Sequence, residues 1–361
     1  MDYLHLKEIE KGYSSSNSEN FFELNIPELI IQEGEFFALL GPSGCGKTTL
    51  LKVVAGLLKL DRGEVFLRDQ SITQVPAEKR GFGMVFQQAL LFPHMTVEAN
   101  VAFGLKMKGV SKAPRLEKAR ELLKAVGLSG FEGRFPPELS GGQQQRVSLA
   151  RALVTCPKVL LMDEPFSSLD PELRDEMRNL VKRLQQDYKQ TTLFVTHDVN
   201  EAYMLADKIG IMKKGRLLQI GKPQELYENP YSPEIALFLG AKNVICGQLS
   251  QGVFQSGLFK LKIAGTEEIY KQSGWIVLRS ETLQLTNERV RDKFRETNEE
   301  TMLTGIVSQC LFSQGYYYLT MQIASQAINV CFPANLSSRP RLGETFELTY
   351  DPRSIHFIPE H

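Results

Sequence analysis

The stretch Gly41-Pro42-Ser43-Gly44-Cys45-Gly46-Lys47-Thr48 decides the fold, because its spacing of glycine, lysine and hydroxyl side chains is that of a phosphate-binding loop. The apolar run 36–40 predicts a buried strand before the loop, and residues 48–58 predict a helix after it. In such a unit, backbone N–H groups surround phosphate oxygens, and the helix N-terminus adds partial positive charge. Lys47 can reach the β- and γ-phosphates, and Thr48, followed by Thr49, can place its hydroxyl on Mg²⁺. Residues 41–49 are therefore predicted to bind a nucleotide.

A second apolar run, 159–162, ends in two carboxylates, Asp163 and Glu164. Ligands bind beyond the carboxyl ends of parallel strands, so we expect this acid pair beside the phosphate loop. Asp163 is predicted to hold Mg²⁺, directly or through water, and Glu164 to act as the general base on an attacking water. Taken alone, the pair could also cap the N-terminus of a helix.

The chain changes character near residues 237–242. Before that point, short apolar runs alternate with helical patterns, which is typical of a parallel α/β sheet. Strands are predicted at 84–87 and 193–196, and helices at 115–126 and 142–153.

Beyond that point, segments with period-two hydrophobicity predict a small β-barrel or sandwich; they lie at 275–278, 316–323 and 345–348. The charged stretch 287–301 is predicted as a loop or a short exposed helix. We therefore expect a nucleotide-binding domain at 1–240, with a helical subdomain at about 88–155, and a β-rich domain at 241–361.

Composition excludes several classes of protein. The 361 residues contain 42 Lys plus Arg and 42 Asp plus Glu, and this zero net charge argues against nucleic acid as a main partner. We see no secretory signal and no apolar run of the roughly 20 residues that a membrane helix needs. The five cysteines are scattered and lack C-x-x-C spacing, which indicates a reducing compartment and no zinc site.

The most specific segment is Leu139-Ser140-Gly141-Gly142-Gln143, which resembles the LSGGQ signature of ATP-binding cassette proteins. Its small residues open a helix and so form a second anion site, which a nucleotide held by the loop of Lys47 does not need. The resemblance implies a head-to-tail dimer that binds ATP and Mg²⁺. In that dimer, residues 140–143 of one chain face the γ-phosphate held by the other.

Further segments are similar to the remaining cassette motifs, in the family's order. Gln87 matches the Q-loop glutamine, which links Mg²⁺ and the attacking water to the helical subdomain. Ser167-Ser168-Leu169-Asp170 resembles the D-loop, and His197 the switch histidine aimed at the γ-phosphate. Tyr13 matches the aromatic residue that stacks on adenine, with plain packing as the alternative. The resemblance covers about residues 4–239. It implies a P-loop α/β fold with a RecA-like parallel core, an antiparallel β subdomain and a helical subdomain, followed by an all-β OB-like domain.

Two segments are similar to importer ATPases in particular. The text from Phe92 to Asn100 matches importers of ferric iron, polyamines, sulfate and sugars, and Arg279-Ser280-Glu281 stands where their tails often read Arg-Pro-Glu. The short tail favours an ion or polyamine system, with ferric iron first. Tails of this kind either sense a ligand or only stabilise the dimer, and the sequence leaves both open.

The importer resemblance implies several partners and a location. The partners are a second copy of the chain, transmembrane permease subunits and, indirectly, a solute-binding protein. The chain would be peripheral on the cytoplasmic face of the membrane. Alternatives are a soluble cassette ATPase not coupled to transport, a scaffold that binds ATP without turnover, and an importer ATPase for sulfate or sugar. Glu164 and His197 argue against the scaffold.

Overall fold

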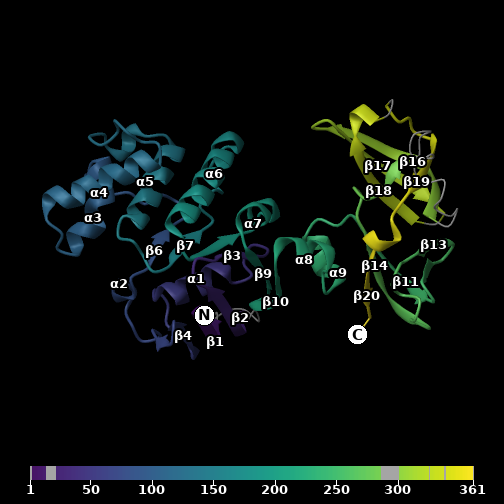
Figure 1. Cartoon of the computed structure of the whole chain (residues 1–361), viewed down its shortest axis with the longest axis horizontal. Coiled ribbons are helices and arrows are strands. Elements are labelled where there is room, and N and C mark those ends of the chain that lie inside the picture. The colour runs from purple at the N-terminus through teal and green to yellow at the C-terminus, as the bar shows by residue number, and fades with distance from the viewer. Residues whose placement is uncertain (1, 14–21, 286–300, 325, 337–338, 361) are drawn as a thin grey trace. The chain divides into compact units, whose positions relative to one another are not determined.

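The computed structural model describes residues 2–13, 22–285, 301–324, 326–336 and 339–360. The chain forms two compact units, Met1–Pro223 and Gln224–His361, each with its own sheets and hydrophobic core (Figure 1). Almost all of the predicted loop or helix at 287–301 falls outside the described residues. Within the described ranges, no helix is both long enough and apolar enough to span a bilayer.

The first unit is built on one ten-stranded sheet with the strand order β5-β4-β1-β2-β10-β9-β3-β8-β7-β6. Its strands are β1 (Asp2–Tyr13), β2 (Phe22–Gln32), β3 (Phe36–Leu40), β4 (Arg62–Leu67), β5 (Gln70–Ser71), β6 (Gly83–Val85), β7 (Leu160–Asp163), β8 (Thr192–Thr196), β9 (Lys208–Lys213) and β10 (Arg216–Gly221). Strands β9, β3, β8, β7 and β6 run parallel. Every residue of β3 and β8 is buried, as expected of parallel strands covered on both faces.

The register of these parallel strands places their carboxyl ends at the same level. Leu40, the last residue of β3, pairs with Thr196, the last residue of β8. Asp163, the last residue of β7, pairs with Val195. The segments that follow β3, β7 and β8 therefore meet at one edge of the sheet, and the predicted parallel α/β core is confirmed.

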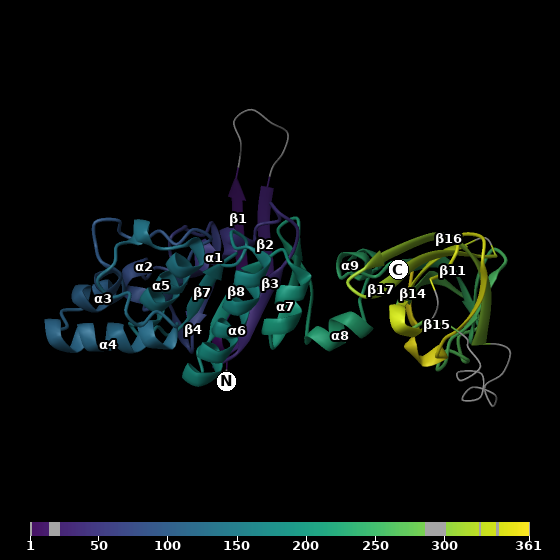
Figure 2. The same ribbon diagram turned by 90° about the horizontal axis from the view of Figure 1, so that it is seen from above.

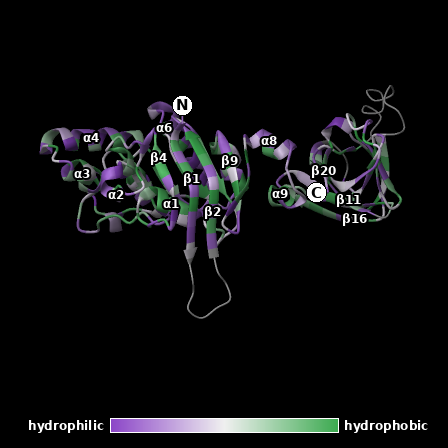
Figure 3. Cartoon of the chain, turned by 90° about the horizontal axis from the view of Figure 1, so that it is seen from below, coloured by the Kyte–Doolittle hydropathy of each residue, from purple (hydrophilic) through white to green (hydrophobic). Residues whose placement is uncertain are grey.

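The remaining strands extend the sheet in antiparallel fashion. Strand β1 pairs with β2 on one side and with β4 on the other. Leu4, Leu6 and Ile9 of β1 are fully buried in the same core as Leu50 and Val54 of helix α1. In Figure 3, both hydrophobic and hydrophilic residues occur along β1 and β2. This mixture is expected because only one face of the hairpin packs against the core.

The helices of the first unit are α1 (Lys47–Ala55), α2 (Ala77–Arg80), α3 (Val97–Met107), α4 (Lys112–Ala125), α5 (Gly141–Leu153), α6 (Pro171–Tyr188) and α7 (Val199–Leu205), with a 3₁₀ turn at Pro136–Glu138. Helices α3, α4 and α5 contact one another and form a group beside the sheet (Figure 2). This group falls within the span predicted as a helical subdomain.

The second unit contains two five-stranded antiparallel sheets, in the orders β13-β12-β11-β14-β20 and β15-β19-β16-β17-β18. Their strands are β11 (Asn243–Ser250), β12 (Val253–Ser256), β13 (Phe259–Lys262), β14 (Gln272–Leu278), β15 (Gln284–Leu285), β16 (Met302–Ser313), β17 (Tyr316–Ile323), β18 (Gln326–Pro333), β19 (Thr345–Thr349) and β20 (His356–Pro359). Phe254 and Ile276 of the first sheet share a buried core with Met321 and Leu348 of the second. The predicted all-β C-terminal part is confirmed.

Two short helices, α8 (Pro223–Glu228) and α9 (Pro233–Phe238), precede the strands of the second unit. Helix α9 contacts β11 and β14, and Ala236 lies in a small core with Val277 and Ile358. This packing explains why the second compact unit begins at Gln224, before the predicted boundary. The division into functional domains at 1–240 and 241–361 remains our prediction.

Candidate functional site

The segment between β3 and α1 forms a glycine-rich loop whose backbone only glycine adopts readily. Gly44 and Gly46 have φ values of 77° and 104°, in the left-handed region. A Cβ atom at Gly41 would lie 2.2 Å from the carbonyl oxygen of Met212. The loop borders a cavity of about 340 Å³ lined by Ser43, Gly44, Gly46, Lys47, Thr48, Thr49 and Glu164. Residues predicted from two separate motifs thus line one cavity.

Lys47 is the buried cation of this loop. Its Nζ donates to the carbonyl oxygens of Gly41 at 2.7 Å and Pro42 at 2.9 Å. Only 4% of Lys47 is exposed, so the loop itself supplies the polar partners that a buried ammonium requires. The neighbouring Cys45 is also buried, and burial raises the pKa of its thiol, which keeps this side chain neutral. Cys45 therefore fills space at a free position of the loop.

Thr48 and Asp163 bring two oxygen donors together. The Thr48 hydroxyl donates to Oδ1 of Asp163 at 2.9 Å. Burial raises the pKa of Asp163, and the hydrogen bond from Thr48 acts in the opposite direction. Oxygen ligands suit Mg²⁺, which in nucleotide sites usually takes one or two protein ligands together with phosphate and water oxygens. The pair fits such an ion, although the described residues contain no group of three or more acidic, His or Cys side chains able to hold a metal.

Glu164 and His197 follow the neighbouring strands β7 and β8 and face each other. Glu164 has a φ of 44°, and its backbone N–H donates to the carbonyl oxygen of Val195 at 3.0 Å. Its Oε2 lies 3.0 Å from Nδ1 of His197. Where the Glu164 carboxylate accepts this hydrogen bond, Nδ1 of the ring is the donor. A carboxylate at the cavity edge thus has a defined orientation.

A buried glutamine that the sequence analysis missed braces the loops around this edge. Gln145 of α5 is 2% exposed, and its Nε2 donates to the carbonyl oxygens of Phe86 at 3.0 Å and Pro165 at 3.1 Å. It thereby joins the segment before Gln87 to the segment after Glu164. The one sign of this role in the sequence is that a polar residue occupies a position on the buried face of the predicted helix.

A second group missed by the sequence analysis supports the segment of His197. The hydroxyl of Thr196 donates to Oε2 of Glu201 at 2.6 Å, and Nη2 of Arg178 lies 3.3 Å from Oε1 of Glu201. Burial raises the pKa of Glu201. Asp198 accepts the backbone N–H groups of Asn200 and Glu201 and so caps α7. The residues on both sides of His197 are thus fixed by hydrogen bonds.

The segment after Gln87 is organised around Asn100 of α3. The Oδ1 of this buried side chain accepts from the backbone N–H of Phe92 at 2.8 Å, and its Nδ2 donates to the carbonyl oxygens of Phe92, Met95 and Thr96, each at 3.1 Å. Thr96 caps α3 by accepting from the N–H of Ala99 at 3.2 Å. Leu90, by contrast, is 57% exposed. These hydrogen bonds hold the segment at its base, and Leu90 presents an apolar side chain to solvent.

Several predicted site residues do not line the cavity of Lys47 within one chain. Ser140 caps α5, with Gln143 N–H donating to its Oγ at 3.3 Å and Gln143 Oε1 accepting from its N–H at 3.0 Å. A Cβ at Gly141 would meet no atom within 4 Å, whereas one at Gly142 would contact Leu173. None of these residues belongs to the cavity lining.

Other predicted residues also lie outside that lining, among them Asp163 and His197, described above, and Gln87, Asp170 and Tyr13. Gln87 is exposed and follows β6, and Asp170 is the exposed N-cap residue of α6. Tyr13 ends β1, and its side chain lies outside what the structure describes. Their roles toward a nucleotide therefore stay predictions.

Comparison with known proteins gives consistent matches. The family model described as ABC transporter matches residues 24–167. The Fe(3+) ions import ATP-binding protein FbpC of Photorhabdus laumondii is 36% identical over 359 residues, covering 99% of this chain and 98% of that protein. The sulfate/thiosulfate import ATP-binding protein CysA of Halalkalibacterium halodurans is 40% identical over 285 residues, covering 78% of this chain and 80% of that protein.

A solved structure matches part of the chain. It is the dimeric, post-hydrolysis state of the ATP-binding cassette MJ0796 bound to ADP and Pi. It is 34% identical to this chain, with a TM-score of 0.55, and the match covers 61% of this chain and 98% of that one.

Proposed function

The chain belongs to the ABC transporter family as an ATPase of an import system, and from this membership we propose that it energises the uptake of an inorganic ion, with ferric iron first. The observation that favours an ion as the transported solute is the extent of the sequence match to FbpC. The FbpC relatives of Photorhabdus laumondii and Escherichia coli O157:H7 align over 99% of this chain, including the second unit. Other FbpC relatives cover a share similar to or smaller than the 78% of the sulfate relative, so the full-length matches favour ferric iron without excluding sulfate. Sulfate remains the second candidate because that relative is similarly identical.

We propose the following roles in ATP hydrolysis for residues at the carboxyl edge of the sheet. Lys47 and the N–H groups of the loop bind and orient the phosphates. Thr48 and Asp163 would hold Mg²⁺, which neutralises phosphate charge when bound. Glu164, which borders the cavity, accepts the proton of the attacking water. His197 orients Glu164 through its Nδ1 and senses the γ-phosphate. Gln87 would link the bound ion to the helical group.

The proposed active form is a head-to-tail dimer. Ser140–Gln143 open α5 with small or polar residues but do not line the cavity of their own chain. In the dimer they would contact the γ-phosphate held by the second copy, and Asp170 would approach the same interface. The dimeric state of the cassette MJ0796 supports this arrangement.

The proposed place of action is the cytoplasmic face of a membrane, against permease subunits supplied by other chains. The exposed Leu90 and the segment to Met95, braced by Asn100, offer a firm surface for a permease. A solute-binding protein would deliver the ion from the other side. A cassette ATPase that is not coupled to transport is the competing proposal.

Uptake measurements test the proposed cargo. Cells that make this protein would receive the substitution Glu164→Gln, and the uptake of radiolabelled ferric iron and sulfate would be followed. We expect loss of ferric iron uptake with sulfate uptake intact, while the exposed control Glu117→Gln on α4 changes neither. Loss of sulfate uptake alone would transfer the proposal to sulfate, and no change in either would refute coupling to these solutes.

A further inference from the structure

The second unit contains a cavity that the proposed ATP hydrolysis does not use. Its volume is about 340 Å³, within the range of small-molecule sites. We call it the Arg279 cavity. It is lined by Tyr227, Glu228, Asn229, Val277, Arg279, Thr282, Arg353, Ser354, Ile355 and His356.

Arg279 is a buried cation with incomplete compensation. Only 5% of it is exposed. Its Nη2 donates to the carbonyl oxygen of Tyr227 at 2.5 Å, and its guanidinium carbon lies 4.0 Å from the centre of the Tyr227 ring. Among the described residues, no carboxylate oxygen lies within 4.0 Å of its guanidinium nitrogens. Burying a charge is costly unless it is paired and fully hydrogen-bonded, so an anion in this cavity would be favourable.

The acids nearest in sequence and space are already engaged. Glu281, two residues after Arg279, accepts hydrogen bonds from the Tyr227 hydroxyl and, at 2.9 Å, from the hydroxyl of Ser280. Glu228 lines the cavity but is exposed and accepts from Nε2 of Gln224 at 2.8 Å. The charge of Glu281 interacts with that of Arg279 and offsets part of it, but neither carboxylate comes within 4.0 Å of the guanidinium nitrogens in the described part of the chain.

Two other side chains shape the cavity: Arg353 adds a second positive charge and His356 a polar ring. Arg353 is exposed at its border. His356 Nε2 donates to the carbonyl oxygen of Pro230 at 3.2 Å, which leaves Nδ1 as the second polar atom of the ring. Burial lowers the pKa of His356, and the charge of Arg279 lowers it further. The ring is thus close enough to Arg279 to sense a change of charge in the cavity.

We propose that the Arg279 cavity binds a small oxyanion, such as sulfate, phosphate or a carboxylate, between Arg279 and Arg353. A guanidinium presents N–H groups in a planar fork that matches the oxygens of all three anions. The motif Arg279-Ser280-Glu281 then has two roles: Glu281 holds Tyr227, and Arg279 stacks on that ring while facing the anion.

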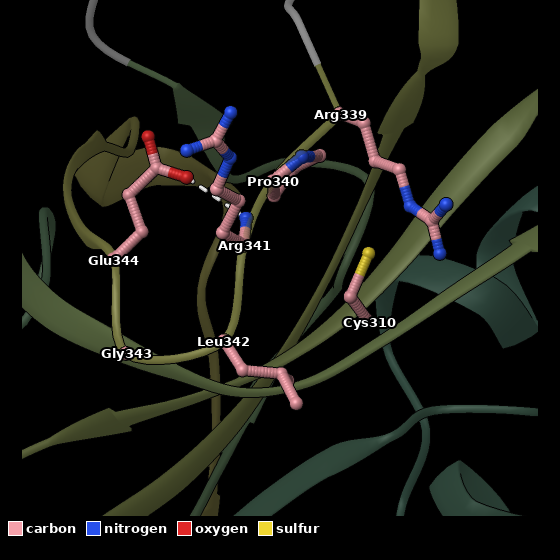
Figure 4. A pocket seen from close by; sticks show the side chains of 7 residues that line it. All are labelled: Cys310, Arg339, Pro340, Arg341, Leu342, Gly343 and Glu344. Carbon is pink, nitrogen blue, oxygen red and sulfur yellow. Dashed lines mark hydrogen bonds between the residues drawn. The ribbon is translucent and has the colours of Figure 1, made fainter.

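A larger hollow in the same unit lacks these features. It measures about 1010 Å³ and is lined by Cys310 and the loop 339–344, which Figure 4 shows with Arg339 beside Cys310. Arg339 and Arg341 are both exposed, so solvent compensates their charges, and Glu344 already accepts the backbone N–H of Arg341 at 2.8 Å. This hollow supplies a control position rather than a second site.

Histidine NMR of the full chain tests the proposal at the cavity itself. The chain has five histidines, so ring-labelled His356 can be assigned by its loss in His356→Gln. Sodium sulfate, phosphate and acetate would be titrated separately at constant ionic strength, with chloride as the reference salt. We expect a saturable shift of the His356 signal with at least one oxyanion, and the most effective salt identifies the anion type. Anions that occupy the phosphate loop of Lys47 leave this signal unchanged.

Substitutions then separate binding from fold. Arg353→Ala removes an exposed side chain, so the protein stays folded, and we expect anion affinity to fall about tenfold, as for loss of a charge-assisted hydrogen bond. Arg279→Lys retains the charge without the fork and also weakens binding. The control Arg339→Ala leaves affinity unchanged. Shifts that never saturate, shifts equal to those in chloride, or equal effects of Arg353→Ala and Arg339→Ala would overturn the proposal.

Discussion

Nδ1 of His197 lies 3.0 Å from Oε2 of Glu164, and the two side chains come from the ends of neighbouring parallel strands. The histidine thus fixes the carboxylate at the border of the cavity that contains Lys47. A substitution at Glu164 that keeps this contact but removes the ability to accept a proton therefore tests proton transfer without changing the position of the side chain.

Glu164→Gln is that substitution. Its amide oxygen can still accept from Nδ1 of His197, but the side chain no longer takes a proton from water. Removal of a general base costs about 10²–10⁴ in rate, so ATP hydrolysis should nearly stop while MgATP still binds. Steady-state ATPase assays and calorimetry measure the two effects. Hydrolysis at the parent rate would show that Glu164 is not the base.

The same variant tests the two-chain site. Because unhydrolysed ATP would lie between Lys47 of one chain and Ser140 of the other, we expect Glu164→Gln to elute as a dimer in MgATP and as a smaller species without it. Adding Ser140→Arg should abolish the dimer, since the bulky side chain blocks the facing γ-phosphate. If the variant stays monomeric in saturating MgATP, the isolated chain does not form the two-chain site, and dimer formation would require the permease.

Lys47→Ala should weaken MgATP binding at least tenfold. A hydrogen bond to a charged group is typically worth about 1.5–3 kcal/mol, and Lys47 would make such bonds to the phosphates. The substitution also leaves the carbonyl oxygens of Gly41 and Pro42 without their donor, so part of the loss comes from a looser loop. Calorimetry with the exposed Lys59→Ala, in the segment after α1, as control measures the difference. Equal affinities of the two variants would refute the phosphate-loop assignment.

The parallel core could be predicted because its strands are buried on both faces, as the apolar run 36–40 shows. Strand β1 could not. Leu4 and Leu6 are buried, but the pairing of β1 with β4 shifts between Lys7 and Glu10, and the next buried residue is Ile9. A bulge of this kind moves the buried set from even to odd positions, so the period-two signal is interrupted in mid-strand.

The residues proposed to bind the phosphates and Mg²⁺ could be identified from the sequence more readily than those that support them. Lys47 and Asp163 stand at fixed places in short motifs, and such motifs can be read directly from the sequence. Gln145 and Glu201 act through partners far away in the chain, such as Phe86 and Arg178. Only folding shows that these polar side chains are buried and paired.

Glu201 should therefore matter for turnover although it does not line the cavity. Glu201→Ala leaves the Thr196 hydroxyl without an acceptor and removes the most buried carboxylate partner of Arg178. Breaking a buried ion pair typically costs about 3–5 kcal/mol, and we expect less here because Asp175 and Asp198 still pair with Arg178. We expect a lower free energy of unfolding and a lower kcat, because the segment of His197 loosens. Glu201→Gln keeps an acceptor for Thr196 and should restore part of kcat. If both variants turn over at the parent rate, Glu201 does not position this segment.

The stability of the second unit should depend on pH through His356. Burial lowers the pKa of His356 below its ordinary value of 6.5, so between these two values the unfolded chain binds more protons than the folded one. Stability is therefore fully present above about pH 6.5 and is lost as pH falls toward the folded-state pKa, by at most about 1.4 kcal/mol per pH unit for one proton. Trp275, the single tryptophan of the chain, lies in β14 and reports unfolding of this unit alone.

Urea titrations followed by Trp275 fluorescence at a series of pH values measure this slope. In His356→Gln the side-chain amide can still donate to the carbonyl oxygen of Pro230 but carries no proton that titrates in this range. We therefore expect a flatter pH profile than the parent, while the control His5→Gln in the first unit leaves it unchanged. A parent profile that stays flat below pH 6.5, or the same slope in His356→Gln, would show that His356 is not the titrating group.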